Sequence, residues 1–237
     1  MNTALAAHTA DIVTSRTNPR VKSLARLQTA RARKERRLYW LEGARCVSTA
    51  LDAPNGIAEL VVSTGASDEV KALADRAASN DVPVTRLAPG CFEKVSALRH
   101  PEGVGAVVPL PAPAPPPDDG ARTVVLWQLQ DPGNAGGIVR TAAAFGCTHI
   151  LAVRPCVDVY HPLAARASAG SVTRAHVFEC DPPCAEEWLR SRAGGVRVLV
   201  SAAPPDSAPT ARDDATVIVV GSEAHGVPES VAAIGRP

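Results

Sequence analysis

Residues 131–146 read DPGNAGGIVRTAAAFG, and this stretch decides the fold. The apolar residues 123–130 before it predict a buried strand and residues 137–145 predict a helix, so the stretch is a strand-to-helix junction with an Asp-Pro turn. This assignment places Arg140 in the first turn of an otherwise small, apolar helix. Because the helix dipole favours anions there, Arg140 is either exposed, paired with an acid, or placed to bind a phosphate or a developing negative charge.

Apolar strands and helices continue to alternate after this junction. The pattern predicts a parallel sheet covered by helices on both faces. Ligands of such sheets bind beyond the carboxyl ends of the strands, and two glycine-rich stretches, 131–137 and 221–226, fall at such ends. The expected strands are 148–154, 175–179, 196–203 and 215–223, and the expected helices are 162–170 and 183–194.

A proline-rich segment, PAPAPPPDDG at 111–120, divides the chain of 237 residues. It predicts an extended, semi-rigid linker between an N-terminal domain over 11–110 and a C-terminal domain over 121–237. The N-terminal domain starts with a helix capped at Asn18-Pro19 and continues as a small α/β sandwich. Its expected strands are 38–43, 58–63, 82–88 and 103–110, and its further helices are 44–52, 67–80 and 91–98.

Charge is distributed unevenly along the chain, although the net charge is only +1. Residues 11–45 carry ten Lys and Arg against three Asp and Glu, whereas residues 46–237 carry fifteen against twenty-one. A basic end on a mildly acidic body indicates contact with a polyanion at the N-terminal end. The run RARKERR at 31–37 is as compatible with a solvated helix end as with a nucleic acid contact.

Several other classes of site are disfavoured. The glycines at 133, 136 and 137 lack the G-x-G-x-x-G spacing of dinucleotide-binding folds, and no P-loop G-K-[ST] occurs. The six cysteines form no C-x-x-C pair, so we expect reduced cysteines in a cytoplasmic protein rather than disulfides, and we predict no metal. The chain has no apolar run of membrane-spanning length, and its first residues lack the pattern of a signal peptide.

The stretch GSEAHGV at 221–227 is, taken alone, compatible with an ordinary strand-to-loop turn. Together with the junction at 131–146 it resembles the SpoU/TrmH family of RNA ribose 2′-O-methyltransferases, which belong to the SPOUT class. The segment RASAG at 166–170 and the N-terminal NPRVK and EG are similar to further parts of that family. The positions that match its two main motifs are Asn134, Gly136, Arg140, Thr141 and Ala142, and then Gly221, Glu223 and Gly226.

The resemblance implies an α/β fold: a C-terminal SPOUT-type parallel-sheet domain with a trefoil knot, and a smaller N-terminal α/β RNA-binding domain. It also implies a homodimer and S-adenosylmethionine as the methyl donor. The cofactor-binding residues would be Ser201, Ala202, Val220, Gly221, Ser222, Glu223 and Gly226. The residues expected to contact RNA are Arg20, Lys22, Arg26, Arg45, Arg166 and Ser168.

The catalytic residues that the resemblance implies are Asn134, Arg140 and Glu223. A ribose 2′-hydroxyl becomes a good nucleophile only as its proton leaves, and arginine is a poor base because its pKa exceeds about 12. We therefore expect Arg140 to hold the phosphate and ribose and to stabilise the alkoxide, although direct assistance to deprotonation stays open. Asn134 would position the ribose or Arg140, and Glu223 would order its loop or an arginine.

The resemblance also leaves two questions open. The chain ends at SVAAIGRP, where the family's third motif would begin, so we expect a truncated sequence; if the natural protein lacked that motif, the knot would be incomplete. Ribosomal RNA is the expected substrate. The alternatives are a transfer RNA methyltransferase and a non-catalytic RNA-binding protein for ribosome assembly.

Overall fold

The computed structural model describes residues 12–53, 56–116, 120–192, 195–199 and 216–235. The chain divides into two compact units. The first contains residues 1–110 and 160–174, and the second contains residues 111–159 and 175–237. Residues 160–174 were expected within the C-terminal domain, and they cluster instead with the N-terminal part of the chain.

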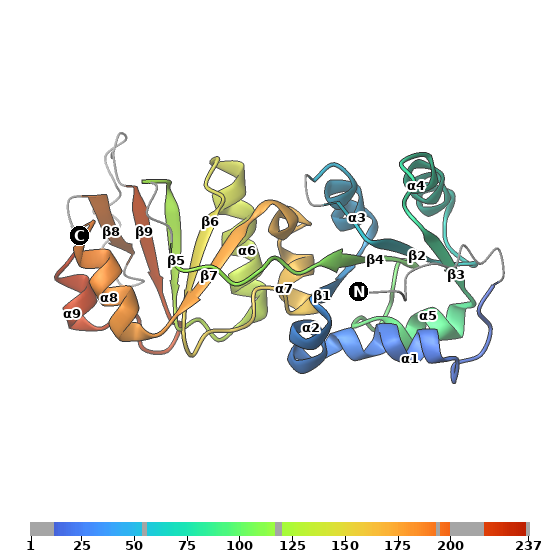
Figure 1. Ribbon diagram of the computed structural model, residues 1–237, viewed down its shortest axis with the longest axis horizontal. Coiled ribbons are helices and arrows are strands. Elements are labelled where there is room, and N and C mark those ends of the chain that lie inside the picture. Colours follow the sequence, from blue (N-terminus) through green and yellow to red (C-terminus); the bar gives the residue numbers. More distant parts are fainter. Residues whose placement is uncertain (1–11, 54–55, 117–119, 193–194, 200–215, 236–237) are drawn as a thin grey trace. The chain divides into compact units, whose positions relative to one another are not determined.

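The first unit is a four-stranded sheet with helices on both sides (Figure 1). The strand order is β1-β4-β2-β3, with β2 and β3 parallel and β4 antiparallel to both β1 and β2. The strands are β1 (Leu38–Glu42), β2 (Glu59–Ser63), β3 (Val84–Leu87) and β4 (Val104–Pro109). Helices α1 (Pro19–Ala25), α2 (Ala30–Arg36) and α5 (Pro89–Val95) lie on one side, and α3 (Ala44–Leu51) and α4 (Asp68–Ser79) lie on the other.

The core between α1, α5 and the sheet depends on one glycine. Val21 and Leu24 of α1 and Phe92 of α5 are buried against Trp40 of β1. A Cβ added at Gly105 of β4 would lie 2.2 Å from Cζ2 of Trp40. Because a buried indole has no room to retreat in a close-packed core, only glycine fits opposite it.

The basic run at 31–37 is mostly structural. The guanidinium of Arg33 is buried and donates to the carbonyl oxygens of Leu27 and Gln28, each at 2.9 Å. Arg36 donates to the carbonyl of Ser23 at 2.9 Å and thereby ties α2 to α1. The run is therefore neither a fully solvated helix end nor a continuous basic patch.

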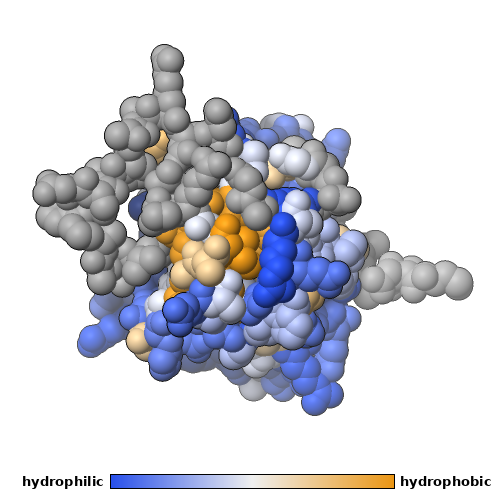
Figure 2. Space-filling view, turned by 90° about the vertical axis from the view of Figure 1, so that its left-hand side faces the viewer, coloured by the Kyte–Doolittle hydropathy of each residue, from blue (hydrophilic) through white to orange (hydrophobic). Residues whose placement is uncertain are grey.

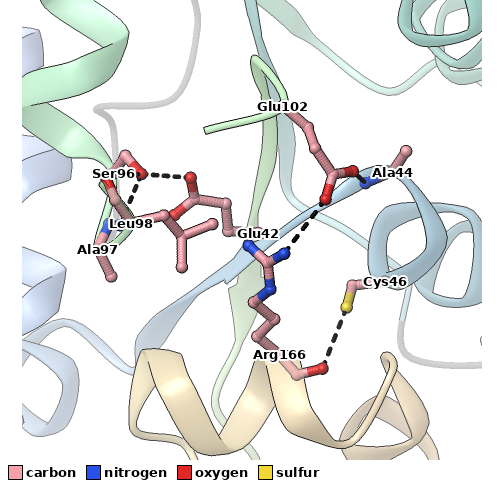
Figure 3. Close-up of polar contacts among 8 residues, drawn as sticks. All are labelled: Glu42, Ala44, Cys46, Ser96, Ala97, Leu98, Glu102 and Arg166. Carbon is pink, nitrogen blue, oxygen red and sulfur yellow. Dashed lines mark hydrogen bonds and ion pairs between the residues drawn. The ribbon is translucent and has the colours of Figure 1, made fainter. Parts of the chain in front are cut away.

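Residues 160–174 pack on β1 and α3 of the first unit. They contain α7 (Pro162–Ala167) and a short 3-10 helix, η2 (Ser171–Arg174). The rings of Tyr39 and Tyr160 lie 5.0 Å apart. Burial raises the pKa of the Cys46 thiol to about 11, so the thiol is protonated near neutral pH and donates to the Arg166 carbonyl at 3.5 Å (Figure 3).

The second unit is a five-stranded sheet in which every strand pair is parallel, as predicted. The order is β7-β6-β5-β9-β8. The strands are β5 (Thr123–Trp127), β6 (His149–Val153), β7 (His176–Cys180), β8 (Val196–Leu199) and β9 (Val217–Gly221), and the helices are α6 (Pro132–Ala144), α8 (Pro182–Arg190) and α9 (Glu229–Ala232). The expected trefoil knot stays a prediction, because residues 200–215, between β8 and β9, lie outside the described residues.

The two faces of this sheet are covered differently. Val125 and Trp127 of β5 and Val217 and Val219 of β9 pack against α8 and α9 in one core cluster, so β5 is a buried strand, as predicted. Alternate residues of a strand point to opposite faces, so Val124, Ile218 and Val220 face the other way, towards α6.

Two further properties of the described residues are the length of their helices and the grouping of the side chains that could bind a metal ion. Within the described ranges, no helix has the length and apolar character needed to cross a membrane. In the same part of the chain, no group of three or more His, Cys, Asp or Glu side chains is arranged to hold a metal ion. All six cysteines are free thiols.

Candidate functional site

The register of two neighbouring strands places the two parts of the site next to each other. β5 and β9 are parallel and adjacent, and Trp127 at the end of β5 is paired with Gly221 at the end of β9. Because both strands end at the same edge of the sheet, the segments that follow them start side by side. This confirms that the two glycine-rich stretches lie together at the carboxyl ends of the strands.

Helix α6 starts five residues earlier than predicted, at Pro132 rather than at 137. Asp131 caps it, because its carboxylate accepts from the backbone N–H of Asn134 at 2.7 Å, and proline suits the first helical position. The prediction that Arg140 lies in the first turn is therefore wrong. Arg140 lies two turns further along the helix, and Asn134 lies in the first turn.

The glycine-rich segment after β9 is a closed bend. The backbone N–H of Ser222 donates to the Gly226 carbonyl at 3.0 Å, and the N–H of Gly226 donates back at 2.8 Å. A Cβ at Gly221 would lie 2.4 Å from the carbonyl carbon of Gly226. Gly226 itself has a φ of +64°, in the left-handed region that favours glycine. The bend therefore requires both glycines and presents backbone rather than side chains.

Glu223 at the tip of the bend is bonded to the first turn of α6. Its Oε1 accepts from Nδ2 of Asn134 at 2.8 Å, and its Oε2 accepts from the backbone N–H of Gln130 at 3.3 Å. The hydrogen bond from Asn134 is the main cause that lowers the pKa of the Glu223 carboxyl. Two roles were expected for Glu223, to order its loop or to order an arginine. The hydrogen bonds fit the first role, and the partner side chain is the amide of Asn134 rather than an arginine.

A cavity of about 850 Å³ joins these parts. Asn134 and Arg140 of α6 line it together with residues 220–223 of the bend, and Arg140 is exposed to it. Further along the sheet, apolar side chains line it, including Phe145, which is 77% exposed, and Ile218, which is 36% exposed. Hydrophobic surface is visible at the β8 end of this unit (Figure 2).

The cofactor-binding residues expected from the sequence divide into two groups. Ser201 and Ala202 lie outside the described residues. The others belong to the bend: Gly226 closes it, and the residues that line the cavity are Val220, Gly221, Ser222 and Glu223.

Three of the residues expected to contact RNA have structural roles. Ser168 is fully buried, and its hydroxyl donates to the Ala165 carbonyl at 2.6 Å, so the prediction that it contacts RNA is wrong. Arg166 forms an ion pair with Glu102 at 3.3 Å within the first unit. Arg20 is half-buried and forms an ion pair with the buried Glu59. The remaining three are exposed: Lys22, Arg26 and Arg45.

Two residues of the site were missed. Gln130 supplies a backbone N–H to Glu223, and its side-chain amide donates to the carbonyls of Gln128 at 3.0 Å and Pro155 at 3.3 Å. Asp131 caps α6. The capping role was readable, since Asp followed by Pro is a helix-start signal, whereas the bonds of Gln130 depend on which loops meet in space.

Two family models match the chain. The model described as the SpoU rRNA Methylase family matches residues 121–234, and the model described as the MRM3-like substrate binding domain matches residues 18–106. An uncharacterized tRNA/rRNA methyltransferase of Synechocystis sp. is 31% identical over 230 residues, which cover 92% of this chain and 81% of that protein. The chain belongs to the SpoU rRNA methylase family.

Two more relatives agree with this membership. The 23S rRNA (guanosine(2553)-2′-O)-methyltransferase of Bacillus subtilis is 27% identical, covering 91% of this chain and 84% of its own. The crystal structure of an S-adenosylmethionine-bound rRNA methyltransferase from Sinorhizobium meliloti has a TM-score of 0.73 and 26% identity, covering 94% of this chain and 85% of that chain. The enzyme class expected from the sequence, an RNA 2′-O-methyltransferase that uses S-adenosylmethionine, is confirmed at the level of the family.

Proposed function

We propose that this SpoU-family protein methylates the 2′-hydroxyl of a ribose in ribosomal RNA. One observation carries the proposal: the bend after β9 and the side chains of Asn134 and Arg140 line the same cavity and are joined by the Asn134–Glu223 hydrogen bond. The bend offers a place for the methyl donor, and Arg140 offers a cation for the RNA. The B. subtilis relative, whose name states a 23S rRNA target, favours ribosomal over transfer RNA.

The bend suits S-adenosylmethionine because it exposes backbone and has no side chain at Gly221. Backbone N–H and C=O groups at a glycine can approach a nucleoside closely. When bound, the cofactor would supply an electrophilic methyl group on a sulfonium. Val220 to Glu223, with Gly226 closing the loop, are the residues of this chain that would hold it.

Arg140 acts in this proposal on the RNA rather than on the cofactor. Its guanidinium can hold a phosphate oxygen with two parallel N–H bonds, and the same charge favours the alkoxide that forms as the 2′-hydroxyl loses its proton. Asn134 and Glu223 fix the first turn of α6 against the bend, so they position Arg140 relative to the methyl donor.

The N-terminal unit would dock RNA through the side of the sheet that carries α1 and α2. These helices, with the intervening turn at 26–28, contain seven Lys and Arg against one Glu, whereas α3 and α4 contain three Lys and Arg against three Asp and Glu. Arg20, Arg33 and Arg36 have structural roles, and the cations left exposed are Lys22, Arg26, Arg31 and Lys34. Lys22 and Arg26 are exposed one helical turn apart. Phosphate contacts of this kind add affinity that falls as salt rises.

We also propose a homodimer. Its support is the apolar part of the cavity, where Phe145 and Ile218 are exposed. Large apolar side chains grouped on a surface commonly mark an association site. Phe145→Asp should lower the mass measured by light scattering from that of two chains to that of one; an unchanged mass would show that the interface lies elsewhere.

Because all cysteines are free, a reducing compartment such as the cytoplasm is the proposed location.

Transfer of a labelled methyl group tests the proposal. The protein, with S-adenosylmethionine labelled in the methyl group, is incubated with ribosomal RNA and separately with transfer RNA. Label at a ribose 2′-oxygen of ribosomal RNA is the expected result. Label only in transfer RNA would show that transfer RNA, and not ribosomal RNA, is the substrate. Binding of ribosomal RNA without any label would favour a non-catalytic RNA-binding protein.

A further inference from the structure

A loop in the first unit is held at both ends by carboxylates. β1, β2 and β3 run in one direction and β4 runs in the other. The carboxyl ends of the first three strands therefore share an edge of the sheet with the start of β4. The loop at residues 96–103, which enters β4, lies at this edge and has no helix or regular strand over residues 96–102.

Glu42 holds the first end of the loop. Its side chain is buried at the end of β1, and its carboxylate accepts from the Ser96 hydroxyl (Figure 3). The same carboxylate accepts from the Ala97 backbone N–H at 3.1 Å and from Trp40 Nε1 at 3.0 Å. The N–H of Leu98 donates in turn to the Ser96 oxygen at 2.9 Å. A buried carboxylate without donors would cost several kcal/mol, so these donors are needed there and the loop is fixed by them.

Glu102 holds the second end of the loop. Its Oε2 accepts from the backbone N–H of Ala44 at 2.8 Å, in the first turn of α3, where the helix dipole favours a negative charge. Its Oε1 pairs with Nη2 of Arg166 at 3.3 Å. Residues 97–101 therefore lie between two ends that are held by hydrogen bonds, close to the start of α3.

The side chains that this arrangement leaves exposed are basic. Arg99 and His100 are exposed in the loop, and Arg45 is exposed in the first turn of α3. Among the described residues, none of the three side chains has a hydrogen-bond or ion-pair partner. Two acids of this edge are already engaged, Glu42 with the loop and Glu102 with Ala44 and Arg166. A cation at a helix N-terminus is unfavourable with respect to the dipole, so Arg45 gains most from an external anion.

We propose that Arg45, Arg99 and His100 form a second contact with the RNA substrate, with Glu42 and Glu102 as positioning residues; this rests on the proposed function. Guanidinium groups bind phosphate oxygens, and arginine and histidine also stack on unpaired bases. A loop fixed before binding loses little conformational freedom on contact, which favours recognition of RNA by shape. The contact is separate from the Lys22 and Arg26 surface, which α1 and its following turn provide.

Binding of a labelled 23S rRNA transcript to the full chain tests the contact. Arg99→Ala with His100→Ala, and Arg45→Ala alone, should each weaken binding about five- to tenfold and reduce the slope of log affinity against log salt by roughly one for each phosphate that is no longer neutralised. The KM for RNA should rise while kcat and the affinity for S-adenosylmethionine stay within twofold. Lys71→Ala, which removes an exposed cation of α4 that is already paired with Asp68 at 2.7 Å, is the control and should change none of these.

Ser96→Ala separates positioning from contact. It removes a hydrogen bond to Glu42 without removing charge, so binding should weaken about two- to threefold with an unchanged salt slope. If the Arg99/His100 and Arg45 variants bind the transcript like the Lys71 variant while wild-type protein methylates it, this inference is wrong and the proposed function stands. Absence of methylation by wild-type protein on every RNA would instead reject the proposed function. A weakened salt slope in the Lys71 variant equal to that of Arg45→Ala would show a diffuse charge effect and also overturn the contact.

Discussion

Asn134 and Glu223 are 89 residues apart in the sequence, and their side chains meet at 2.8 Å. The bond connects the first turn of α6 to the bend after β9. Arg140 projects from the same helix, and the bend is the proposed cofactor site, so this contact, together with the bond from the Gln130 N–H to Glu223, fixes the two relative to each other. Its loss should therefore affect catalysis more than stability, because both partners are exposed.

A double-mutant cycle measures that coupling. Asn134→Ala and Glu223→Ala should each reduce methyl transfer roughly 10- to 100-fold, since small misplacement of reacting groups costs about that much. The double variant should lose little more than the worse single variant, because residues in one network are not additive. The measurement is the kcat of the two single variants and the double variant at saturating RNA. If the fold-loss in the double variant equals the product of the two single losses, the two side chains act independently.

The ionisation of Glu223 gives a second prediction. The hydrogen bond from Asn134 lowers the pKa of its carboxyl, so the charged form and the bond are present above the ordinary glutamate pKa of about 4.3 and are lost as pH falls through the lowered value. In Asn134→Ala the pKa should move back up. Carboxyl ¹³C titration by NMR measures both, and equal pKa values in the two proteins would contradict the assignment.

Gly221 should not tolerate even alanine. The added Cβ would lie 2.4 Å from the Gly226 carbonyl carbon, and a backbone atom cannot move away cheaply. Gly221→Ala, and more severely Gly221→Val, should open the bend and abolish S-adenosylmethionine binding in calorimetry. Gly90→Ala, where nothing lies within 4 Å of the new Cβ, is the control. Normal cofactor affinity in Gly221→Val would place the cofactor elsewhere.

Gly105 gives an independent prediction for the first unit. Gly105→Ala places a methyl group against the buried Trp40 ring, and overpacking of this kind costs about 1–3 kcal/mol. Amides of β1 and β4 should exchange faster in hydrogen-exchange mass spectrometry, while amides of the second unit keep their protection. Unchanged protection of β1 and β4 would show that the ring has room that the structure does not indicate.

The sequence predicted the strand and helix alternation well, because apolar runs and capping residues are local signals. It placed the start of α6 too late, because Asp131-Pro132 was assigned to a turn before the helix, whereas Asp131 caps the helix and Pro132 is its first residue. It assigned Ser168 to RNA because a hydroxyl in a motif shows nothing of its burial. It also missed that residues 160–174 pack with the N-terminal unit, since such long-range packing leaves no periodic pattern.

The two motifs at 131–146 and 221–227 predicted the position of the site for a physical reason. Both follow strands that the alternation places in one parallel sheet, so their meeting at one edge follows from topology. The partner of Glu223 did not follow, because an amide, an arginine or a backbone group would all satisfy a carboxylate. The split of the basic run into structural arginines and exposed cations likewise required Arg33 and Arg36 to be seen in place.

Methyl transfer by Arg140→Ala tests the central claim most directly. With ribosomal RNA and labelled S-adenosylmethionine, the account predicts at least about a 100-fold loss of turnover, as for removal of a group that stabilises developing charge, with cofactor affinity unchanged. Arg122→Ala, which removes an arginine that lines the same cavity from the start of β5, should keep its turnover. Turnover retained in Arg140→Ala within a few-fold of wild type would contradict the account.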